Sequence, residues 1–88
     1  MKRVTVFGSR YWPQCEPVKE FLSANNIDFD YFDISENLMN LKMYLRCRDF
    51  RTEFDKVKEQ GKIGIPLIVV GDGEKFIIER EPTLDELK

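Results

Sequence analysis

A tight-turn signal between two strand-like segments near the C-terminus is the feature that most constrains the fold. Residues 67–70 are all apolar, and Gly71-Asp72-Gly73 separates them from residues 75–78, which have the pattern of a returning strand. An Asp-Gly pair between two such segments is typical of a β-hairpin. We therefore expect these segments to be neighbouring antiparallel strands of a sheet.

The N-terminal third of the chain predicts a strand, a helix and a second strand. Residues 2–7 are rich in β-branched and aromatic side chains, which indicates a buried strand. Pro13 suits the first position of a helix that closes at Asn25-Asn26. Residues 27–34 alternate apolar and acidic side chains at first, which favours a strand with one solvated face or at a sheet edge. The face of the helix expected to be buried contains Cys15, Val18, Leu22 and Asn25.

The middle and the end of the chain predict three further helices. Three leucines at helical spacing, Leu38, Leu41 and Leu45, follow Ser35, a plausible N-cap. Arg48-Asp49 interrupts that pattern, and a second short helix is expected from a Thr52 cap to Gly61. Thr83-x-x-Glu86 is a capping box that predicts a last short helix.

The resulting order is strand, helix, strand, two helices, strand, strand, helix. A helix joins the first two strands, so they are expected to be parallel with a right-handed crossover. This order predicts an α/β fold, a four-stranded mixed sheet flanked by helices on both faces. With 88 residues the chain is expected to form a single domain over residues 1–88.

Composition excludes several classes of function. The chain has no histidine, which removes imidazole catalysis, and two cysteines, which argues against a disulfide framework and a closed zinc site. The net charge of -2 offers no basic footprint for nucleic acid. No apolar segment approaches the ~20 residues of a membrane span, and we expect the first residues to form a strand rather than a signal peptide. We expect a cytoplasmic monomer that binds neither nucleic acid nor membrane.

Two motifs lie next to expected strands: Trp12-Pro13-Gln14-Cys15 follows the first strand, and Ile65-Pro66 precedes the third. With them the chain resembles the glutaredoxins, whose motif C-P-x-C matches residues 12–15 and whose cis proline matches Pro66. Lys19, the pair Phe21-Leu22 and the C-terminal hairpin match as well. The resemblance implies a thioredoxin fold, no prosthetic cofactor and no metal, glutathione as co-substrate, and glutathione or protein thiols and disulfides as partners.

The resemblance also assigns the site, with marked departures from the family pattern. Trp12 stands at the position of the nucleophilic cysteine, and Cys15 is the second cysteine of the motif. Glu79-Arg80-Glu81-Pro82 replaces a glycine pair that helps to hold glutathione, and Ser9 replaces a lysine, with Arg10 beside it. The resemblance assigns Cys15 and Trp12 to the catalytic position. It assigns substrate binding to Arg10, Tyr11, Pro13, Gln14, Ile65 and Pro66.

The residues themselves leave alternatives open. Cys15 is either a reactive thiol or a small buried residue, and Trp12 is either a binding platform or a plug of the former active site. Cys47 is either a redox thiol or an ordinary helix residue. The basic residues that either hold an anionic ligand or are solvated surface charges are Arg10, Lys19 and Arg51.

Two functions follow from these alternatives. The first is a glutaredoxin-like thiol–disulfide oxidoreductase in cell redox homeostasis, working through Cys15 alone or with Cys47, with activity impaired by Trp12. The second is a catalytically inactive thioredoxin-fold module that binds a thiol or a peptide ligand at Trp12 and Ile65-Pro66.

Overall fold

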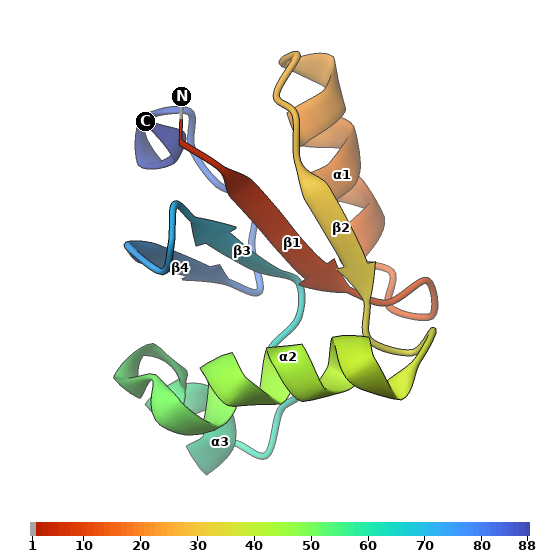
Figure 1. The fold of residues 1–88 in the computed structure, drawn as a ribbon, viewed down its shortest axis with the longest axis vertical. Helices are drawn as coiled ribbons and strands as arrows, with labels where there is room; N and C mark the ends of the chain where they lie inside the picture. Colours follow the sequence, from red (N-terminus) through yellow and green to blue (C-terminus); the bar gives the residue numbers. More distant parts are fainter. Residues whose placement is uncertain (1) are drawn as a thin grey trace.

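The computed structural model describes residues 2–88 and has the four-stranded mixed sheet expected from the sequence (Figure 1). The strand order is β2-β1-β3-β4, with β1 parallel to β2 and antiparallel to β3, and β3 antiparallel to β4. β2 therefore lies at an edge of the sheet, one of the two alternatives expected for residues 27–34. The strands are β1 (Val4–Gly8), β2 (Asp30–Asp33), β3 (Leu67–Val70) and β4 (Lys75–Ile78).

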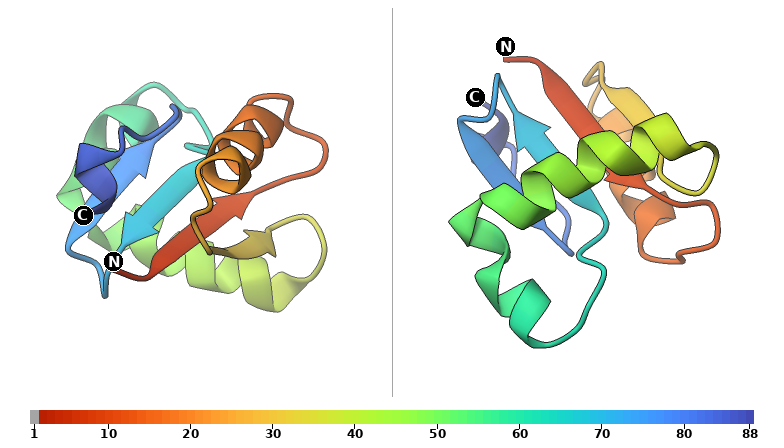
Figure 2. Two further views of the ribbon diagram at one scale, coloured as in Figure 1. Left: turned by 90° about the horizontal axis from the view of Figure 1, so that it is seen from above. Right: turned by 60° about the horizontal axis from the view of Figure 1, so that its bottom comes forward.

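Helices cover both faces of the sheet, as expected (Figure 2). One face carries α1 (Cys15–Ala24) and the short 3-10 helix η2 (Asp85–Leu87). The other carries α2 (Leu38–Phe50), the 3-10 helix η1 (Thr52–Phe54) and α3 (Asp55–Glu59). None of the helices within residues 2–88 is both long and apolar enough to cross a membrane.

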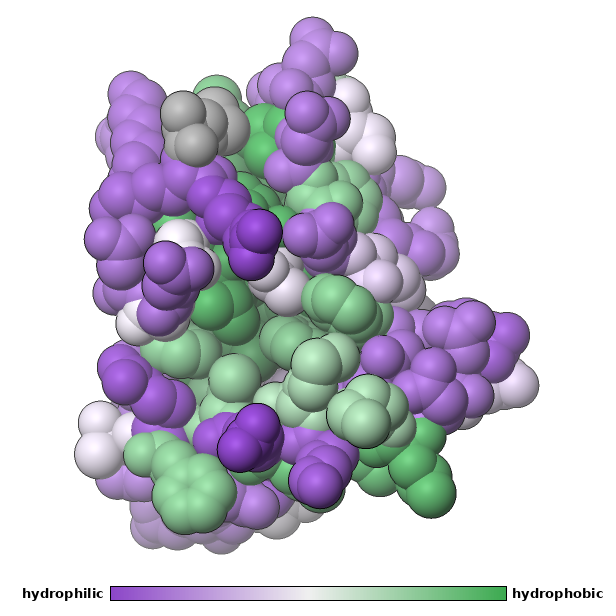
Figure 3. Space-filling view, viewed as in Figure 1, coloured by the Kyte–Doolittle hydropathy of each residue, from purple (hydrophilic) through white to green (hydrophobic). Residues whose placement is uncertain are grey.

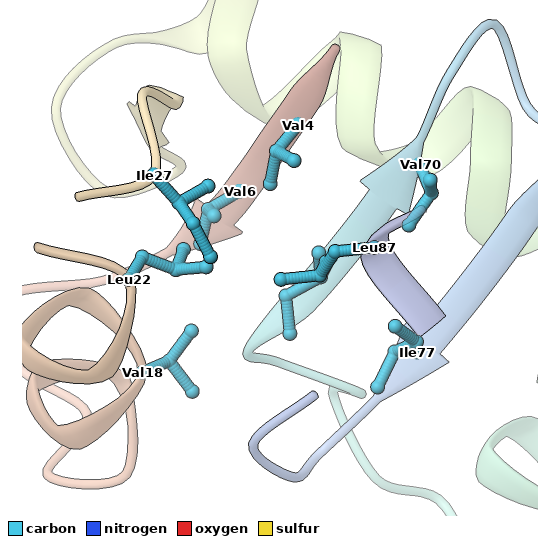
Figure 4. Close-up of a cluster of buried hydrophobic side chains, with 9 residues drawn as sticks. Val4, Val6, Val18, Leu22, Ile27, Val70, Ile77 and Leu87 are labelled. Atoms are coloured by element: carbon cyan, nitrogen blue, oxygen red, sulfur yellow. The ribbon is translucent and has the colours of Figure 1, made fainter. Parts of the chain in front are cut away.

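The side-chain alternation of the strands divides the core into two clusters. Val6, Ile68 and Ile77 face α1 and pack against Val18 and Leu22 of that helix, as Figure 4 shows for the labelled members. The second cluster lies on the opposite face, beneath α2 and α3. Its buried members are Phe7, Cys15, Tyr44, Phe54, Val57, Ile65, Leu67 and Val69. Cys15 therefore sits where the start of α1 meets the core of the other face.

Helix α2 exists as predicted, but its buried face differs from the leucine pattern that signalled it. Leu38 is 82% exposed and Leu45 is also exposed, whereas Asn40 and Tyr44 are buried. Both polar tips have partners: the Asn40 amide donates to the Asp33 carbonyl oxygen at 3.0 Å, and the Tyr44 hydroxyl donates to the Ile63 carbonyl oxygen. Buried polar side chains are tolerated when they are hydrogen-bonded in this way. Helix α2 also continues to Phe50, through the expected break at Arg48-Asp49.

Of the three helix caps expected from the sequence, two are different in the structure and one is confirmed. Asn37, not Ser35, caps α2, because its side-chain oxygen accepts from the Asn40 N–H at 2.8 Å while Ser35 bonds to Asp33. Arg51, not Thr52, is the N-cap of η1, and Thr52 is its first residue. The capping box before η2 is confirmed: the Thr83 N–H donates to Glu86 Oε1 at 2.9 Å, and the Glu86 N–H donates to Thr83 Oγ1 at 3.3 Å.

Candidate functional site

A tight turn leads from β1 into α1 and presents Trp12. The Trp12 N–H donates to the Ser9 carbonyl oxygen at 3.0 Å, and the Cys15 N–H donates to the Trp12 carbonyl oxygen at 3.1 Å. These bonds use residues 12–14 as the turn, so α1 begins at Cys15 and not at Pro13, where the sequence pattern placed its start. Trp12 is half-buried and packs against the second core cluster, so its ring is fixed at the rim of the sheet.

Cys15 is enclosed at the start of α1. Its side chain is 1% exposed, and Sγ accepts a hydrogen bond from the Ser9 N–H at 3.4 Å. Burial raises the pKa of the thiol, although the Ser9 N–H and the Lys19 ammonium act in the opposite direction. A buried thiol with a raised pKa is protonated at neutral pH and is a weak nucleophile.

Gly8 allows two polar atoms to approach the end of β1. A Cβ at Gly8 would lie 2.8 Å from Cys15 Sγ and 2.8 Å from the Tyr31 hydroxyl. That hydroxyl is buried without a hydrogen-bond partner among the residues described, and burial raises its pKa to about 12. Tyr31 therefore forms the back wall of the Cys15 site, a role that the sequence pattern of β2 did not indicate.

Trp12 and Ile65 lie on one groove of about 710 Å³, which we call the Trp12 groove. Its lining comes from the turn before α1, the loop after α3 and the end of β4. The lining residues are Trp12, Gln14, Gly61, Lys62, Ile63, Ile65 and Glu79. The Ile65–Pro66 peptide bond is cis, and Pro66 is buried directly behind Ile65. Three of the site residues assigned from the sequence, Trp12, Gln14 and Ile65, are thus brought together.

Two side chains of α2 hold the loop that forms one wall of the groove. The Tyr44 hydroxyl donates to the Ile63 carbonyl oxygen, and Arg48 Nη2 donates to the Lys62 carbonyl oxygen at 2.8 Å. Gly64, between Ile63 and Ile65, has a φ of 89° and leaves room for the Tyr44 hydroxyl. The shape of the groove therefore depends on packing between α2 and this loop.

The remaining assigned residues lie outside the groove lining. Tyr11 is 74% exposed and stacks with the Arg10 guanidinium at 5.4 Å from the ring centroid. The Arg10 guanidinium is also 3.7 Å from Asp33 Oδ2, so an acidic partner already occupies it. Pro13 is exposed on the outer side of the turn. The structure does not bring Arg10, Tyr11 or Pro13 together with Ile65.

Asp33 anchors the turn, and the sequence interpretation of the acidic segment as an exposed strand face missed it. Asp33 is 9% exposed, and its carboxylate accepts from the Arg10 N–H at 3.0 Å and from the Ser35 N–H at 2.8 Å. Burial alone raises the pKa of Asp33, but the hydrogen bonds from Ser35 and Arg10 outweigh it, so the pKa lies below its ordinary value. Asp33 pairs in register with Gly8. The sequence did contain a signal for this role. Asp33 was expected at the end of a strand parallel to β1, and the carboxyl ends of parallel strands meet at one edge of the sheet.

Replacing Asp33 by asparagine is expected to destabilise the protein by about 2 kcal/mol at pH 7, because hydrogen bonds to a charged acceptor are lost. The folded-state pKa of Asp33 is lowered, so its contribution is fully present above the unfolded-state pKa of about 4 and is lost progressively as pH falls from there through the lower folded-state pKa. Urea unfolding at pH 7 and pH 3 measures both effects: the difference between wild type and Asp33→Asn narrows at pH 3. Asp30→Asn, an exposed change on the same strand, is the control and leaves stability within about 0.5 kcal/mol. An equal loss of unfolding free energy in Asp33→Asn and Asp30→Asn would contradict the anchoring role of Asp33.

Each of the two remaining basic candidates pairs with a carboxylate, and Cys47 lies at the edge of the core. Lys19 pairs with Glu16 at 2.9 Å, and Arg51 pairs with Glu53 at 3.0 Å. Cys47 is a free, half-buried thiol whose pKa is raised by burial, with Arg51 acting in the opposite direction. Cys47 packs against the second core cluster. Figure 3 shows apolar side chains gathered near the centre of the face that α2 covers. Within residues 2–88, no three His, Cys, Asp or Glu side chains form a group suited to a metal ion.

Comparison with known proteins places this geometry in a family. The sequence matches the family model described as Glutaredoxin over residues 4–76. It is 32% identical over 74 residues to an uncharacterized protein of Haemophilus influenzae, a match that covers 84% of this chain and 86% of the relative. A crystal structure of a mutant of the thioredoxin-like protein BC3987 superposes with a TM-score of 0.57 at 25% identity, covering 99% of this chain and 91% of that one. The expected thioredoxin fold is confirmed, and the chain belongs to the glutaredoxin family.

Proposed function

We propose that the chain is a single glutaredoxin-like domain of thiol–disulfide redox homeostasis whose turnover is impaired because Trp12 stands at the position of the nucleophile. The family and the fold support a thiol–disulfide oxidoreductase-like function, and the family suggests glutathione or protein thiols as partners. The observation that carries the proposal is the Trp12 groove, which Trp12, Gln14 and Ile65 line beside Cys15.

The backbone groups of Ile65 face the groove lining without hydrogen-bond partners. Ile65 is only 2% exposed, but among residues 2–88 no hydrogen bond reaches its N–H or C=O, whereas the Pro66 carbonyl oxygen accepts from the Glu79 N–H at 2.7 Å. An extended segment beside Ile65 gains strand-like hydrogen bonds from such groups. Glutathione and a protein segment around a cysteine both have the backbone amides that these groups require.

In the proposed reaction the Cys15 thiolate attacks a mixed disulfide between glutathione and a protein. A bond forms from Cys15 Sγ to the glutathione sulfur, the original S–S bond breaks, and the protein sulfur leaves as a thiolate. A second glutathione thiolate then attacks this new disulfide, which releases oxidised glutathione and restores the Cys15 thiolate. Glutathione is the reductant, and the burial of Cys15 makes the first step slow.

Turnover of a glutathionylated peptide in excess glutathione tests this proposal. We expect slow turnover that increases as pH rises from about 7 to about 9.5, because burial raises the pKa of the Cys15 thiol above its ordinary value of about 8.5. Cys15→Ser is expected to abolish turnover. Cys47→Ser, which removes the second free thiol, is the matched control and is expected to retain it. Equal turnover in wild type and Cys15→Ser would overturn the catalytic part of the proposal.

A second candidate function is a binding module without turnover. The enclosure of Cys15 and the position of Trp12 in the groove lining favour it. Trp12 is the single tryptophan of the chain, so its fluorescence reports directly on the groove. A change in Trp12 emission on titration with glutathione or a cysteine peptide, with no turnover at any pH, would select this candidate over the enzyme.

A further inference from the structure

Glu79 occupies a backbone conformation that side-chain-bearing residues rarely adopt. Its φ is 63°, in the left-handed region that favours glycine. The hydrogen bond from its N–H to the Pro66 carbonyl oxygen, at 2.7 Å, holds it there. The same residue lines the Trp12 groove. An acidic side chain therefore stands at the groove on a strained backbone, and such strain is often found where a side chain serves a site.

The charge of Glu79 is not neutralised by its surroundings. None of the ion pairs among residues 2–88 includes Glu79. The adjacent cation, Arg80, is engaged by both carboxylate oxygens of Glu86, at 2.9 and 2.6 Å. A ligand with a positive charge next to Glu79 would give this carboxylate the ion-pair partner that it lacks.

Lys62 is the other charged residue of the groove lining, and its ammonium is more than 4.0 Å from the Glu79 carboxylate, the limit for an ion pair. Both residues are exposed, but Lys62 has the longer flexible stem, which lets its ammonium remain in water, whereas the Glu79 backbone is held at the groove by its N–H bond to the Pro66 carbonyl oxygen. Trp12 lines the same groove and adds an indole ring, whose face attracts cations and repels anions. Glu79 and Trp12 together favour a cation, and Lys62 opposes them weakly.

We infer that the Trp12 groove selects an extended protein segment with a basic side chain next to its cysteine, and disfavours glutathione. This inference rests on the proposed function, because it names the ligand class of the same groove. Glutathione carries two carboxylates and one ammonium, so its net charge of about -1 is poorly matched to Glu79. An extended segment pairs with the backbone groups of Ile65 and places an arginine or lysine side chain between Glu79 and Trp12.

Fluorescence titrations of Trp12 with two blocked pentapeptides test the inference. Both contain a central cysteine; one has arginine next to it and the other has glutamate at that position, and glutathione is the third probe. We expect the arginine peptide to bind about fivefold more tightly than the other two at low salt, as for a partly exposed charge pair. The preference is expected to weaken at high salt.

Variants of the groove separate this inference from simple folding effects. Glu79→Gly removes the carboxylate and relieves the left-handed strain, so it folds, and it is expected to abolish the preference for arginine. Glu81→Gln, an exposed change two residues away, is the control and keeps the preference. Lys62→Gln is expected to increase it. Equal binding of the three probes, or a preference that survives Glu79→Gly, would overturn the inference alone, whereas no response to any probe would overturn the proposed function as well.

Discussion

Replacing Trp12 by cysteine is expected to raise the turnover of a glutathione mixed disulfide by about 100-fold at pH 7. The introduced thiol would stand in the turn before α1, where the unpaired N–H groups of the helix start favour a thiolate. Lowering a thiol pKa from about 9 to about 7 alone raises the thiolate fraction at pH 7 from about 1% to about half. Position 12 is also half-buried and lines the groove, unlike the enclosed Cys15.

The electrons balance without a further cofactor. The introduced thiolate attacks the glutathione sulfur of the mixed disulfide and releases the protein thiolate, and a second glutathione thiolate releases oxidised glutathione. Trp12→Ser is the matched control, because it opens the groove equally but supplies no thiol. Steady-state turnover of all three proteins over a pH series checks the prediction. If Trp12→Cys is no faster than Trp12→Ser, the groove does not place a disulfide at position 12.

The sequence predicted best those elements whose ends depend on residues close together in the chain. The third and fourth strands were predicted with the bounds that the structure has, because a turn signal fixes both ends of the hairpin. The capping box before η2 was likewise confirmed, since its two hydrogen bonds join residues three apart. The first two strands were predicted longer than the Val4–Gly8 and Asp30–Asp33 of the structure, because pairing with neighbours decides where a strand ends.

Long-range contacts determine what the sequence could not predict. The buried face of α2 is set by the hydrogen bond that Tyr44 makes to a carbonyl oxygen 19 residues away, which no helical periodicity encodes. The role of Asp33 depends on its register beside Gly8, and the acidic segment around it favoured a solvated face instead. At the site, the resemblance placed Trp12 near Ile65 and residues 79–82 where the family holds glutathione, but only the fold shows that Glu79 lines the groove with a positive φ.

Replacing Gly64 by alanine is expected to lower the free energy of unfolding by about 3 kcal/mol and to weaken ligand binding in the groove. The backbone at Gly64 has a φ of 89°, and an added Cβ would lie 2.7 Å from the Tyr44 hydroxyl and 2.9 Å from Val57 Cγ1. Neither neighbour can retreat, because both belong to the buried core beneath α2 and α3. Moving Tyr44 would also break its hydrogen bond to the Ile63 carbonyl oxygen, which holds the groove wall.

Gly61→Ala separates the two contributions to this loss. Gly61 also has a positive φ, of 69°, but an added Cβ there meets nothing within 4 Å. Gly61→Ala is therefore expected to cost about 1 kcal/mol from backbone strain alone, and to leave the Tyr44 hydrogen bond intact. Urea unfolding gives both free energies, and Trp12 emission reports on the groove. The remaining difference of about 2 kcal/mol in the free energy of unfolding measures the close packing of Gly64 against α2 and α3. If the two variants lose equal free energies of unfolding, this packing does not hold the wall of the groove.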